Sequence, residues 1–378
     1  MARKMKDSGI EWIGEIPEGW EVAPLKRFAS IQTGNTPTKT SDSNYYASTG
    51  IPWIKPDNLG YSHSISKTSE YLTSEGALCA RIMPPNTVYV CCIGSLGKVG
   101  YSSISCACNQ QINALIFNDL MFWKYGYYLT IAQESQYLLF GNGNVLQIIN
   151  STSQGNIACV LPPLENQHLI ACYLDSVYSD IEILIAKARS SIEEYKKLKQ
   201  AVITQAVATQ QCSHIKLKYL MNVIVDCPHE TPTYSFTGNY YVIRTADQAL
   251  ASLRCDEDMY RLDASEYKKR TRRLTLDKDD IVYGREGERW GLACIVPESN
   301  KYCLGQRIMQ FRCNTKFLYP KYAMYTLNSE PVYLQGVADT IGSTSPHVNI
   351  STVCNYLLPV PALTEQKEIA NYLDAKCA

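Results

Sequence analysis

The longest regular pattern of hydrophobic positions lies in residues 161–209. It follows the pair Pro162 and Pro163 near the start of this segment. Apolar side chains recur there at alternating intervals of four and three residues, with one polar break at Ser191, which is the spacing of a heptad seam. At ~1.5 Å rise per residue, the predicted helix is roughly 60 Å long, more than a compact domain needs. Such a seam predicts either a partner helix or packing against the chain's own domains. Its positions are Ile170, Leu174, Val177, Ile181, Leu184, Ala188, Tyr195, Leu198 and Val202.

The start of this pattern recurs near the end of the sequence. LPPLENQHLIACYLD at 161–175 matches LPVPALTEQKEIANYLD at 358–374, which pairs Gln167 with Gln366 at a separation of 199 residues. Three more pairs follow in the same order: VYVCCIGSLGKVGYSSI with DIVYGREGERWGLACIV, CNQQINALIF with CLGQRIMQFR, and GNGNVLQIIN with IGSTSPHVNI. A repeat of this length predicts two copies of a domain followed by a helix.

The segments between the repeated helices consist of short β-branched and aromatic runs bounded by Gly, Pro and Asn, which predicts strands and hairpins. One hairpin turn carries Gly94 and Gly97, and the repeat aligns these two residues with Gly284 and Gly287. We therefore expect an α+β fold with two duplicated domains of mixed, mostly antiparallel sheet and helices, joined by the long helix. The expected boundaries are 1–22 for an N-terminal segment, 23–160 for domain one, 161–209 for the helix, 210–358 for domain two and 359–378 for the start of a second helix.

The bulk composition narrows the possible functions. Basic and acidic residues number 36 each, so any contact with nucleic acid has to come from local patches. No apolar run approaches eighteen residues and no signal sequence opens the chain, which predicts a soluble intracellular protein. The fifteen cysteines are odd in number and form no C-x-x-C pair, and the five histidines show no ligand spacing. We expect buried reduced thiols and no metal site.

Polar residues in the loops of each domain are candidates for contact with DNA, because arginine suits guanine and amides suit adenine. A basic run at 268–273 stands out in a neutral chain and is a candidate for phosphate contact, although such runs are ordinarily solvated surface. The matched Gln110 and Gln306 are expected to be structural. The candidates are Thr33, Gly34, Asn35, Thr36, Lys55, Asn58, Ser95 and Lys98 in domain one, and Arg244, Lys268, Lys269, Arg270, Arg272, Arg273, Tyr283, Arg285, Arg289, Arg307, Ser343 and His347 in domain two.

No constellation of catalytic residues is predicted. The turn at Gly94 lacks the spacing of a phosphate-binding loop, and Glu266 and Lys268 match a nuclease pattern only loosely.

In order and in duplication, these segments resemble the specificity subunits of type I restriction–modification systems. The resemblance covers SGIEWIGEIPEGW, TGNTP and IPWIKPDNL, the first helix LPPLENQHLIACYLD, GREGERWGLACIV with CLGQRIMQF, and the second helix LPVPALTEQKEIANYLD. It implies a non-catalytic reader in which each domain is a target recognition domain for one half of a split double-stranded DNA site. The two conserved helices of that family pair as an antiparallel coiled coil that spaces the half-sites.

The same resemblance implies the partners. Two methyltransferase (modification) subunits dock on the helices, for which the candidate residues are Ile170, Leu174, Val177, Ile181, Leu184 and Leu198, and restriction subunits join them. S-adenosylmethionine, ATP and Mg²⁺ belong to those partners, and none is expected on this chain. The implied location is the cytoplasm of a prokaryote, in association with the nucleoid.

In one respect the chain differs from the family pattern. The second helix is expected to continue for some thirty residues, whereas this sequence stops at Ala378, so the seam lacks its partner in the same chain. Trimming, natural truncation and a helix supplied by a second chain or fragment are the three explanations. Two other functions stay open: the recognition part of a fused restriction–methylation enzyme, and a truncated protein that binds partners without reading DNA.

Overall fold

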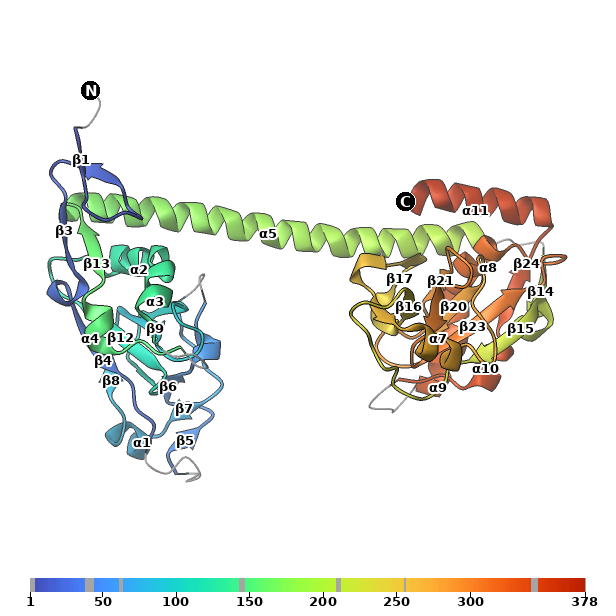
Figure 1. Cartoon of the computed structure of the whole chain (residues 1–378), viewed down its shortest axis with the longest axis horizontal. Helices are drawn as coiled ribbons and strands as arrows, with labels where there is room; N and C mark the ends of the chain where they lie inside the picture. The colour runs from blue at the N-terminus through green and yellow to red at the C-terminus, as the bar shows by residue number, and fades with distance from the viewer. Residues whose placement is uncertain are drawn as a thin grey trace. The chain divides into compact units, whose positions relative to one another are not determined.

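The structure is a computed structural model that describes residues 4–37, 44–60, 64–142, 147–208, 212–254, 256–340 and 346–377. It contains two compact units, Met1–Ala186 and Lys187–Ala378, each with its own hydrophobic core. The predicted long helix is confirmed as α5, an unbroken helix over Leu164–Val207, and it contributes residues to both units (Figure 1). No helix in the described ranges is long and apolar enough to cross a membrane.

Unit 1 is built on a four-stranded antiparallel sheet in the order β10-β9-β12-β4. Its central strand β9 is buried along its whole length, because its apolar side chains face helices on one side and a second sheet on the other. The strands are β10 (Val99–Ser102), β9 (Thr87–Cys91), β12 (Ile112–Phe117) and β4 (Ala29–Thr33).

The second sheet of unit 1 has the order β5-β7-β6-β11-β8 and is mixed, because β6 and β11 run parallel. Two small ladders complete the unit: a hairpin of β1 with β2, and the antiparallel pair β3 with β13 that leads into α5. The strands are β5 (Tyr46–Ala47), β7 (Tyr71–Leu72), β6 (Ile51–Ile54), β11 (Cys106–Cys108), β8 (Ile82–Met83), β1 (Met5–Asp7), β2 (Glu15–Pro17), β3 (Glu21–Pro24) and β13 (Ala158–Leu161). The helices before α5 are η1 (Leu25–Arg27), η2 (Pro56–Asn58), α1 (Ser74–Leu78), α2 (Trp123–Ala132), α3 (Glu134–Phe140) and α4 (Ser151–Gly155).

Unit 2 repeats this layout, which confirms the predicted duplication and the α+β class. Its four-stranded antiparallel sheet has the order β15-β23-β20-β21, a smaller sheet holds the parallel pair β16 and β22, and β14 pairs with β24. The strands are β14 (Ser213–Lys216), β15 (Met221–Asp226), β16 (Tyr240–Ile243), β17 (Gln248–Ala249), β18 (Ser252–Leu253), β19 (Tyr260–Leu262), β20 (Ile281–Gly284), β21 (Ala293–Ile295), β22 (Tyr302–Leu304), β23 (Ile308–Cys313) and β24 (Leu357–Val360). The helices are α6 (Leu217–Leu220), η3 (Thr245–Asp247), η4 (Asp256–Asp258), α7 (Ala264–Arg270), α8 (Pro320–Leu327), α9 (Glu330–Thr340), α10 (Ile350–Cys354) and α11 (Leu363–Cys377).

A buried glutamine fastens the start of α5 to unit 1, and its repeat partner fastens α11 to unit 2. Gln167 donates from Nε2 to the carbonyls of Leu120 and Pro162 at 3.0 and 2.9 Å, and its Oε1 accepts from the Phe122 amide at 2.7 Å. Gln366 makes the equivalent three bonds, to the Phe317 and Pro361 carbonyls at 3.0 and 2.8 Å and from the Tyr319 amide at 2.8 Å. Each glutamine therefore lies on the face of its helix that packs against the sheet domain.

An aspartate that follows the glutamine on each of these helices is duplicated in the same way. Asp175 accepts from the Tyr128 hydroxyl at 2.5 Å and pairs with Lys124 at 3.2 Å. In unit 2, Asp374 accepts from the Tyr325 hydroxyl at 2.9 Å and pairs with Lys321. The sequence repeat therefore preserves the contacts that hold each helix on its sheet domain.

The apolar seam of α5 is half-buried at its start, exposed in its middle and paired with another helix in its last turns. Ile170 and Leu174 are half-buried against the core of unit 1, and Val177 is half-buried as well. Ile181, Leu184 and Leu198 are exposed. These exposed positions are the part of the predicted docking seam that neither unit covers within the described residues.

The last turns of α5 do have a partner in the same chain, so the expectation of an unpaired seam is wrong there. In unit 2, α11 runs alongside the end of α5 (Figure 1), where the Lys199 ammonium donates to the Cys377 carbonyl at 3.0 Å. Ile203 and Val207 of α5 share one hydrophobic core with Leu373 of α11.

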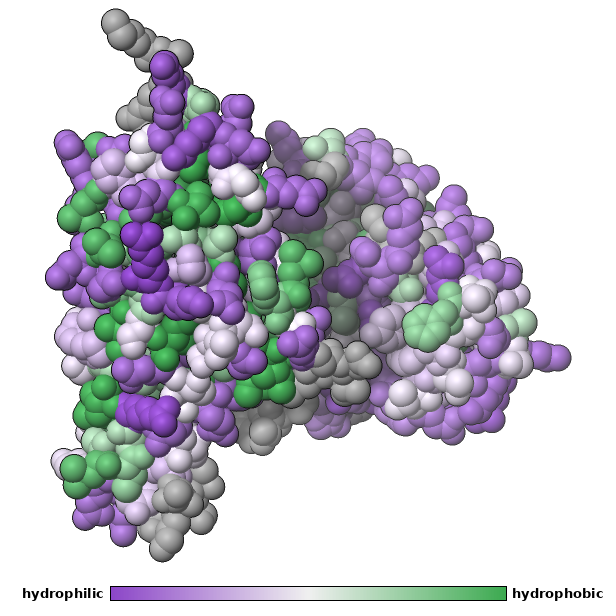
Figure 2. Space-filling model, turned by 60° about the vertical axis from the view of Figure 1, so that its left-hand side comes forward, coloured by the Kyte–Doolittle hydropathy of each residue, from purple (hydrophilic) through white to green (hydrophobic). Residues whose placement is uncertain are grey.

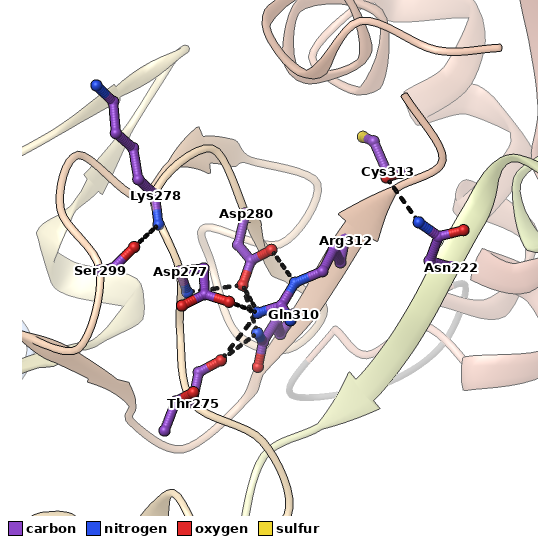
Figure 3. Close-up of polar contacts among 9 residues, drawn as sticks. All are labelled: Asn222, Thr275, Asp277, Lys278, Asp280, Ser299, Gln310, Arg312 and Cys313. Carbon is purple, nitrogen blue, oxygen red and sulfur yellow. Dashed lines mark hydrogen bonds and ion pairs between the residues drawn. The ribbon is translucent and has the colours of Figure 1, made fainter. Parts of the chain in front are cut away.

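Unit 2 is locked at one end of its four-stranded sheet by an ion pair between a buried aspartate and a half-buried arginine (Figure 3). Asp280, which is 2% exposed, accepts from Nε and one terminal nitrogen of Arg312 at 2.8 Å each, and from the Gln310 amide at 2.7 Å. The same guanidinium pairs with Asp277 at 2.7 Å. Hydrogen bonding to Asp280 raises the pKa of Arg312 further above its ordinary value. This network joins the start of β20 to the end of β23.

Most of the described cysteines are buried, as the scattered apolar placement predicts. Burial raises the pKa of the Cys92, Cys294 and Cys303 thiols to about 12, because a thiolate would lose its hydration there. On the face of unit 1 presented in Figure 2, hydrophobic residues lie in several groups among hydrophilic ones. Exposed apolar side chains of this unit include Leu78, Leu138, Leu139 and Phe140.

Candidate nucleic-acid interface

In unit 2, the loops that follow four strands meet at one edge of the sheets. Strands β15 and β20 end at this edge and β23 begins there, as shown by the bonds from the Cys227 amide to the Ile308 carbonyl at 3.2 Å and from the Arg285 amide to the Arg307 carbonyl at 3.1 Å. Strand β16 ends there too, since the Gly305 amide donates to the Ile243 carbonyl at 2.7 Å. We call residues 226–231, 244–247, 284–289, 305–307 and 346–347 the loop edge of unit 2.

Unit 1 has an equivalent loop edge, formed by residues 33–36, 55–58, 92–98 and 109–111. The same three bonds define it: Gly34 amide to Ile112 carbonyl at 2.9 Å, Cys92 amide to Gln111 carbonyl at 2.7 Å, and Asn109 amide to Ile54 carbonyl at 3.0 Å. All eight residues proposed for domain one lie on this edge, although the sequence scatters them over three loops.

The first of these loops is held close to the sheet. A Cβ at Gly34 would lie 2.3 Å from the Cys108 carbonyl oxygen, so a larger residue cannot take its place without moving backbone. Asn35 donates from Nδ2 to the Cys79 carbonyl at 2.7 Å, and its Oδ1 accepts from the Arg81 amide at 2.8 Å. The Thr36 hydroxyl bonds to Gln110. These contacts orient the loop, which lies across the edge.

Each edge carries one cation at the same turn. Lys55 begins η2, where its amide donates to Asn58 Oδ1 at 2.8 Å, and its ammonium pairs with Glu70 at 2.7 Å. Arg244 begins η3 in the same manner, with its amide 2.9 Å from Asp247 Oδ2. The two turns thus share one backbone conformation while their side chains differ in charge geometry.

The Arg244 guanidinium is held on both sides. It makes two bonds to the Asp247 carboxylate, at 2.9 and 2.8 Å, and lies 3.7 Å from the centre of the Tyr260 ring. Hydrogen bonding to Asp247 raises the pKa of Arg244 further above its ordinary value. A guanidinium oriented in this way is suited to a planar acceptor such as a base edge or a phosphate.

Several predicted residues of unit 2 and unit 1 are accessible. Arg307 is exposed, its backbone has a φ of +70°, and its side chain has no hydrogen-bond partner among the described residues. Arg289 is exposed and donates to the Ala246 and Gln248 carbonyls at 2.8 and 3.1 Å. His347 is exposed beside Glu286, with which it forms a β-bridge. Ser95 and Lys98 are exposed on the edge of unit 1.

Three predictions of direct DNA contact are wrong, because their side chains lie inside unit 2. Tyr283 is fully buried, with its hydroxyl 3.3 Å from that of Tyr356. Arg270 is 6% exposed and donates to the carbonyls of Leu304 and Glu230 at 2.9 Å each. It therefore fastens the loop after β15 to the end of β22.

Arg285 is the third of these residues. It is 6% exposed and is paired with Asp226 at 3.1 and 3.2 Å and with Glu286 at 2.8 Å. This buried side chain, with two half-buried carboxylate partners and the Val348 carbonyl at 3.5 Å, holds the edge together.

The wrong prediction for Arg285 arose from the alignment of the two repeats. The repeat aligns Gly284 with Gly94, which places Arg285 at the exposed turn. In the structure, Gly287 takes the place of Gly94, because the Gly94 amide donates to the Gln147 carbonyl and the Gly287 amide to the Pro346 carbonyl, at 3.0 and 2.8 Å. The shift of three residues moves Arg285 back into the sheet.

The basic run is only partly free. Lys268, Arg272 and Arg273 are exposed, whereas Lys269, also exposed, pairs with Glu230 at 3.2 Å. Ser343 lies outside the described residues.

The sequence pattern did not indicate some polar contacts on the edge of unit 2. The predicted-structural Gln306 is half-exposed and donates to the Thr231 hydroxyl at 3.1 Å. Asp226, Cys227 and His229 bring three ligand-type atoms within 4.8 Å of one another. Both carboxylate oxygens of Asp226 are bonded by Arg285, and Oδ2 also contacts His229 Nε2 at 3.0 Å, so this cluster acts as a hydrogen-bonded brace. The sequence could not indicate this brace, because Arg285 lies fifty-nine residues from Asp226 and no local pattern links the two.

The comparisons with known proteins agree with this architecture. Residues 17–194 and 227–376 match the family of the type I restriction modification DNA specificity domain. The MjaVIII specificity subunit of Methanocaldococcus jannaschii is 22% identical over 95% of this chain and 86% of its own length, and the StySPI specificity subunit of Salmonella potsdam is 22% identical over 96% and 82%. The HindI specificity subunit of Haemophilus influenzae is 30% identical over 40% of this chain, which is 33% of its own length.

The fold is found in solved structures. One of them comes from work on the assembly and conformational transition of a type I restriction–modification system, and it superposes with a TM-score of 0.64 at 16% identity over 96% of this chain and 91% of its own. The relatives named above are specificity subunits of type I restriction enzymes, in line with the predicted non-catalytic role. The family match spans both sheet domains and much of α5 and α11, and the chain therefore belongs to the family of type I restriction–modification DNA specificity proteins.

Proposed function

We propose that this chain is the DNA-reading subunit of a type I restriction–modification complex and that each unit reads one half of a bipartite target through its loop edge. The observation that carries the proposal is a contrast within each unit. The sheets and the fastened helix, which we call the frame, are alike in the two units, whereas the loop edges differ. The frames share strand order, helix fastening and the three edge-defining bonds, whereas the edge residues differ in size, charge and hydrogen-bonding groups. A duplicated frame with different edges suits the reading of two different sequences.

The proposed contact residues lie on the two loop edges or in the basic run, and all of them except the buried Gly34 are at least partly exposed. Unit 1 contributes amides, hydroxyls and lysines, and unit 2 contributes mainly arginines, which favour guanine. The exposed basic run contributes sequence-independent phosphate contacts. The residues are Thr33, Gly34, Asn35, Thr36, Lys55, Asn58, Ser95, Lys98, Arg244, Lys268, Lys269, Arg272, Arg273, Arg289, Arg307 and His347.

We further propose that α5 binds the methyltransferase subunits. Support comes from its exposed apolar residues Ile181, Leu184 and Leu198, because a buried interface of apolar side chains is the usual basis of a stable subunit contact. Restriction subunits complete the complex in this proposal. Transfer of a methyl group from S-adenosylmethionine and ATP-driven steps with Mg²⁺ are assigned to those partners, which act on the chromosomal DNA of a prokaryotic cell.

The test is to co-express this chain with the methyltransferase encoded beside it and to map N6-methyladenine across the host genome by single-molecule sequencing. The expected result is methylation at an asymmetric motif with two defined halves and a fixed gap. Methylation at a motif with one half, or none when complex formation is confirmed by co-purification, would contradict two independent readers.

A further inference from the structure

We propose that Phe236 of unit 2 inserts between two neighbouring base pairs of the half-site that this unit reads and unstacks them, with the rings of Tyr234 and Tyr260 extending the apolar contact. This inference rests on the proposed DNA-reading function and deepens it. It adds an apolar contact to a site that the sequence suggested only through polar and cationic residues.

Phe236 is exposed to solvent to an extent that is unusual for a large apolar side chain. Its side chain is fully exposed, with a relative exposure of 103%, although it is one of only seven phenylalanines in the chain. A lone exposed apolar residue is common on protein surfaces. Here, however, Tyr234 and Tyr260 beside it are also exposed, at 42% and 49%, so three aromatic side chains form one patch.

The loop that carries Phe236 is fastened at three points. At its start, the Arg270 guanidinium binds the Glu230 carbonyl at 2.9 Å. Just before the phenylalanine, the Ser235 amide donates to the Arg261 carbonyl of β19 at 2.9 Å. Just after it, Gly238 packs so closely that a Cβ there would lie 2.1 Å from the Leu262 carbonyl oxygen. The backbone therefore holds the phenyl ring outward, which lowers the entropic cost of inserting it.

The patch connects to the loop edge through Tyr260. The rings of Tyr234 and Tyr260 meet edge-on with centroids 4.7 Å apart, and the Arg244 guanidinium of the loop edge lies 3.7 Å from the Tyr260 centroid. The loop itself begins at residue 228, directly after the edge residue Cys227, whose sulfur accepts from the Arg307 amide at 3.2 Å. DNA bound at Arg244 and Arg307 is thus adjacent to the aromatic patch.

The chemistry of the hollow beside the patch favours bases over phosphates. Phe236, Tyr234, Tyr260 and Met259 line a hollow of about 570 Å³, together with Ser235, Arg261 and Glu257. The Glu257 carboxylate repels phosphate, but it can accept a bond from the amino group of cytosine or adenine. Aromatic walls with one acid and one cation among the lining residues therefore suit the apolar faces and the amino groups of unstacked base pairs.

Inserted apolar side chains are an established means of kinking DNA, at an unstacking cost of a few kcal/mol that the new contacts offset. Removing the phenyl ring is expected to weaken binding of the target duplex about tenfold, and base unstacking at one step should disappear.

The experiment uses the complex of this chain with its co-expressed methyltransferase and duplexes of the methylated motif in which 2-aminopurine replaces one base at a time. Unstacked 2-aminopurine fluoresces strongly, so the wild-type complex should brighten it several-fold at one step in the half of unit 2. F236A should abolish that signal and F236L should retain part of it. F317A is the matched control, since Phe317 is 55% exposed and follows β23 at the opposite end of the sheet.

The outcomes separate the inference from the function on which it rests. If the wild-type complex binds its motif and F236A brightens the same positions as wild type, the insertion is excluded while the reading function stands. Brightening at no step of that half-site has the same meaning. If the wild-type complex does not distinguish its motif from an unrelated duplex, the proposed function itself fails.

Discussion

Gln167 and Gln366 make the same three hydrogen bonds, each in its own unit, although they are 199 residues apart in the sequence. Each side chain is buried, and each binds a carbonyl just before its helix, an amide and a carbonyl from the loop before the neighbouring helix. The glutamine thus substitutes for backbone partners that the first turn of a helix and a loop would otherwise lack.

Replacing either glutamine by alanine should therefore destabilise its unit. Loss of three bonds leaves two carbonyls and one amide unsatisfied in the interior, and the expected cost is about 2–4 kcal/mol. Urea denaturation followed by circular dichroism measures the change for Gln167→Ala and Gln366→Ala. Gln205→Ala, on an exposed position of α5, is the control and should stay within ~0.5 kcal/mol of wild type. An equally small effect at Gln366 would refute the fastening role.

The lock at Asp280 gives a second prediction about stability. Asp280→Asn keeps the shape but removes the charge, so the Arg312 guanidinium loses its buried partner and keeps only Asp277 at its exposed side. We expect a loss of about 1–3 kcal/mol in the unfolding free energy of unit 2. The exposed neighbour Asp279, at a φ of +69°, tolerates asparagine, and Asp279→Asn should leave the melting temperature unchanged. Similar melting of both variants would argue against the lock.

Arg307 and Arg285 should respond differently to alanine. Arg307→Ala removes an exposed group without a protein partner, so folding should be intact while sequence preference relaxes at one or two base pairs, by about 1–3 kcal/mol each. Arg285→Ala should instead lower stability, because the half-buried Asp226 is left without its arginine partner. Methylation of single-base variants of the motif, together with thermal melts, distinguishes the two. Relaxed preference in a fully stable Arg285→Ala protein would restore that residue to the readout.

Phosphate contact by the basic run predicts a change that is independent of sequence. Arg272→Ala should weaken binding to target and unrelated duplexes equally and reduce the slope of log affinity against log salt by about 1. Fluorescence anisotropy at several salt concentrations measures this slope. The exposed Arg254→Ala is the control for a general loss of positive charge, and an equal slope change there would show that the run has no special role.

Alkaline pH should destabilise the fold. The buried thiols of Cys92, Cys294 and Cys303 have pKa values raised to about 12 from an ordinary 9.0, whereas in the unfolded chain they ionise near 9.0. The unfolded state therefore releases protons first as pH rises, and stability that is complete below about pH 9 is lost progressively between about 9 and 12. Thermal melts under reducing conditions should show a steady fall of the melting temperature above pH 9. A constant value up to pH 11 would contradict this linkage.

Much of the fold could be predicted from the sequence, because its strongest signals are local. Heptad spacing gave α5, and paired segments such as LPPLENQHL and LPVPALTEQ gave the duplication. The grouping of Thr33, Lys55 and Ser95 on one edge follows from strand pairing between distant residues, which no local pattern specifies. Loop polarity nevertheless selected residues of unit 1 that the strands bring together on one edge.

Two of the three candidates whose side chains the structure buries are arginines. Arg270 and Arg285 look like surface residues by type, but each is satisfied by partners that are distant in the sequence: carbonyls at Leu304 and Glu230, and the carboxylate of Asp226. Burial of arginine depends on such partners, so composition alone cannot distinguish a reader from a brace. The exposure of Phe236 was not expected for the opposite reason, because apolar residues are assigned to the core by default.

The position of the Asp280–Arg312 network at the far end of β20 and β23 from Arg307 has an evolutionary meaning. Mutations of exposed loop-edge residues such as Arg307 and His347 leave the contacts that hold the sheet intact, so they carry little penalty in folding. In the proposed reading role, selection can then change what a unit recognises in single steps, through viable intermediates, and in one unit without the other. A lineage that carries this protein can therefore acquire new specificities faster than it could redesign a domain.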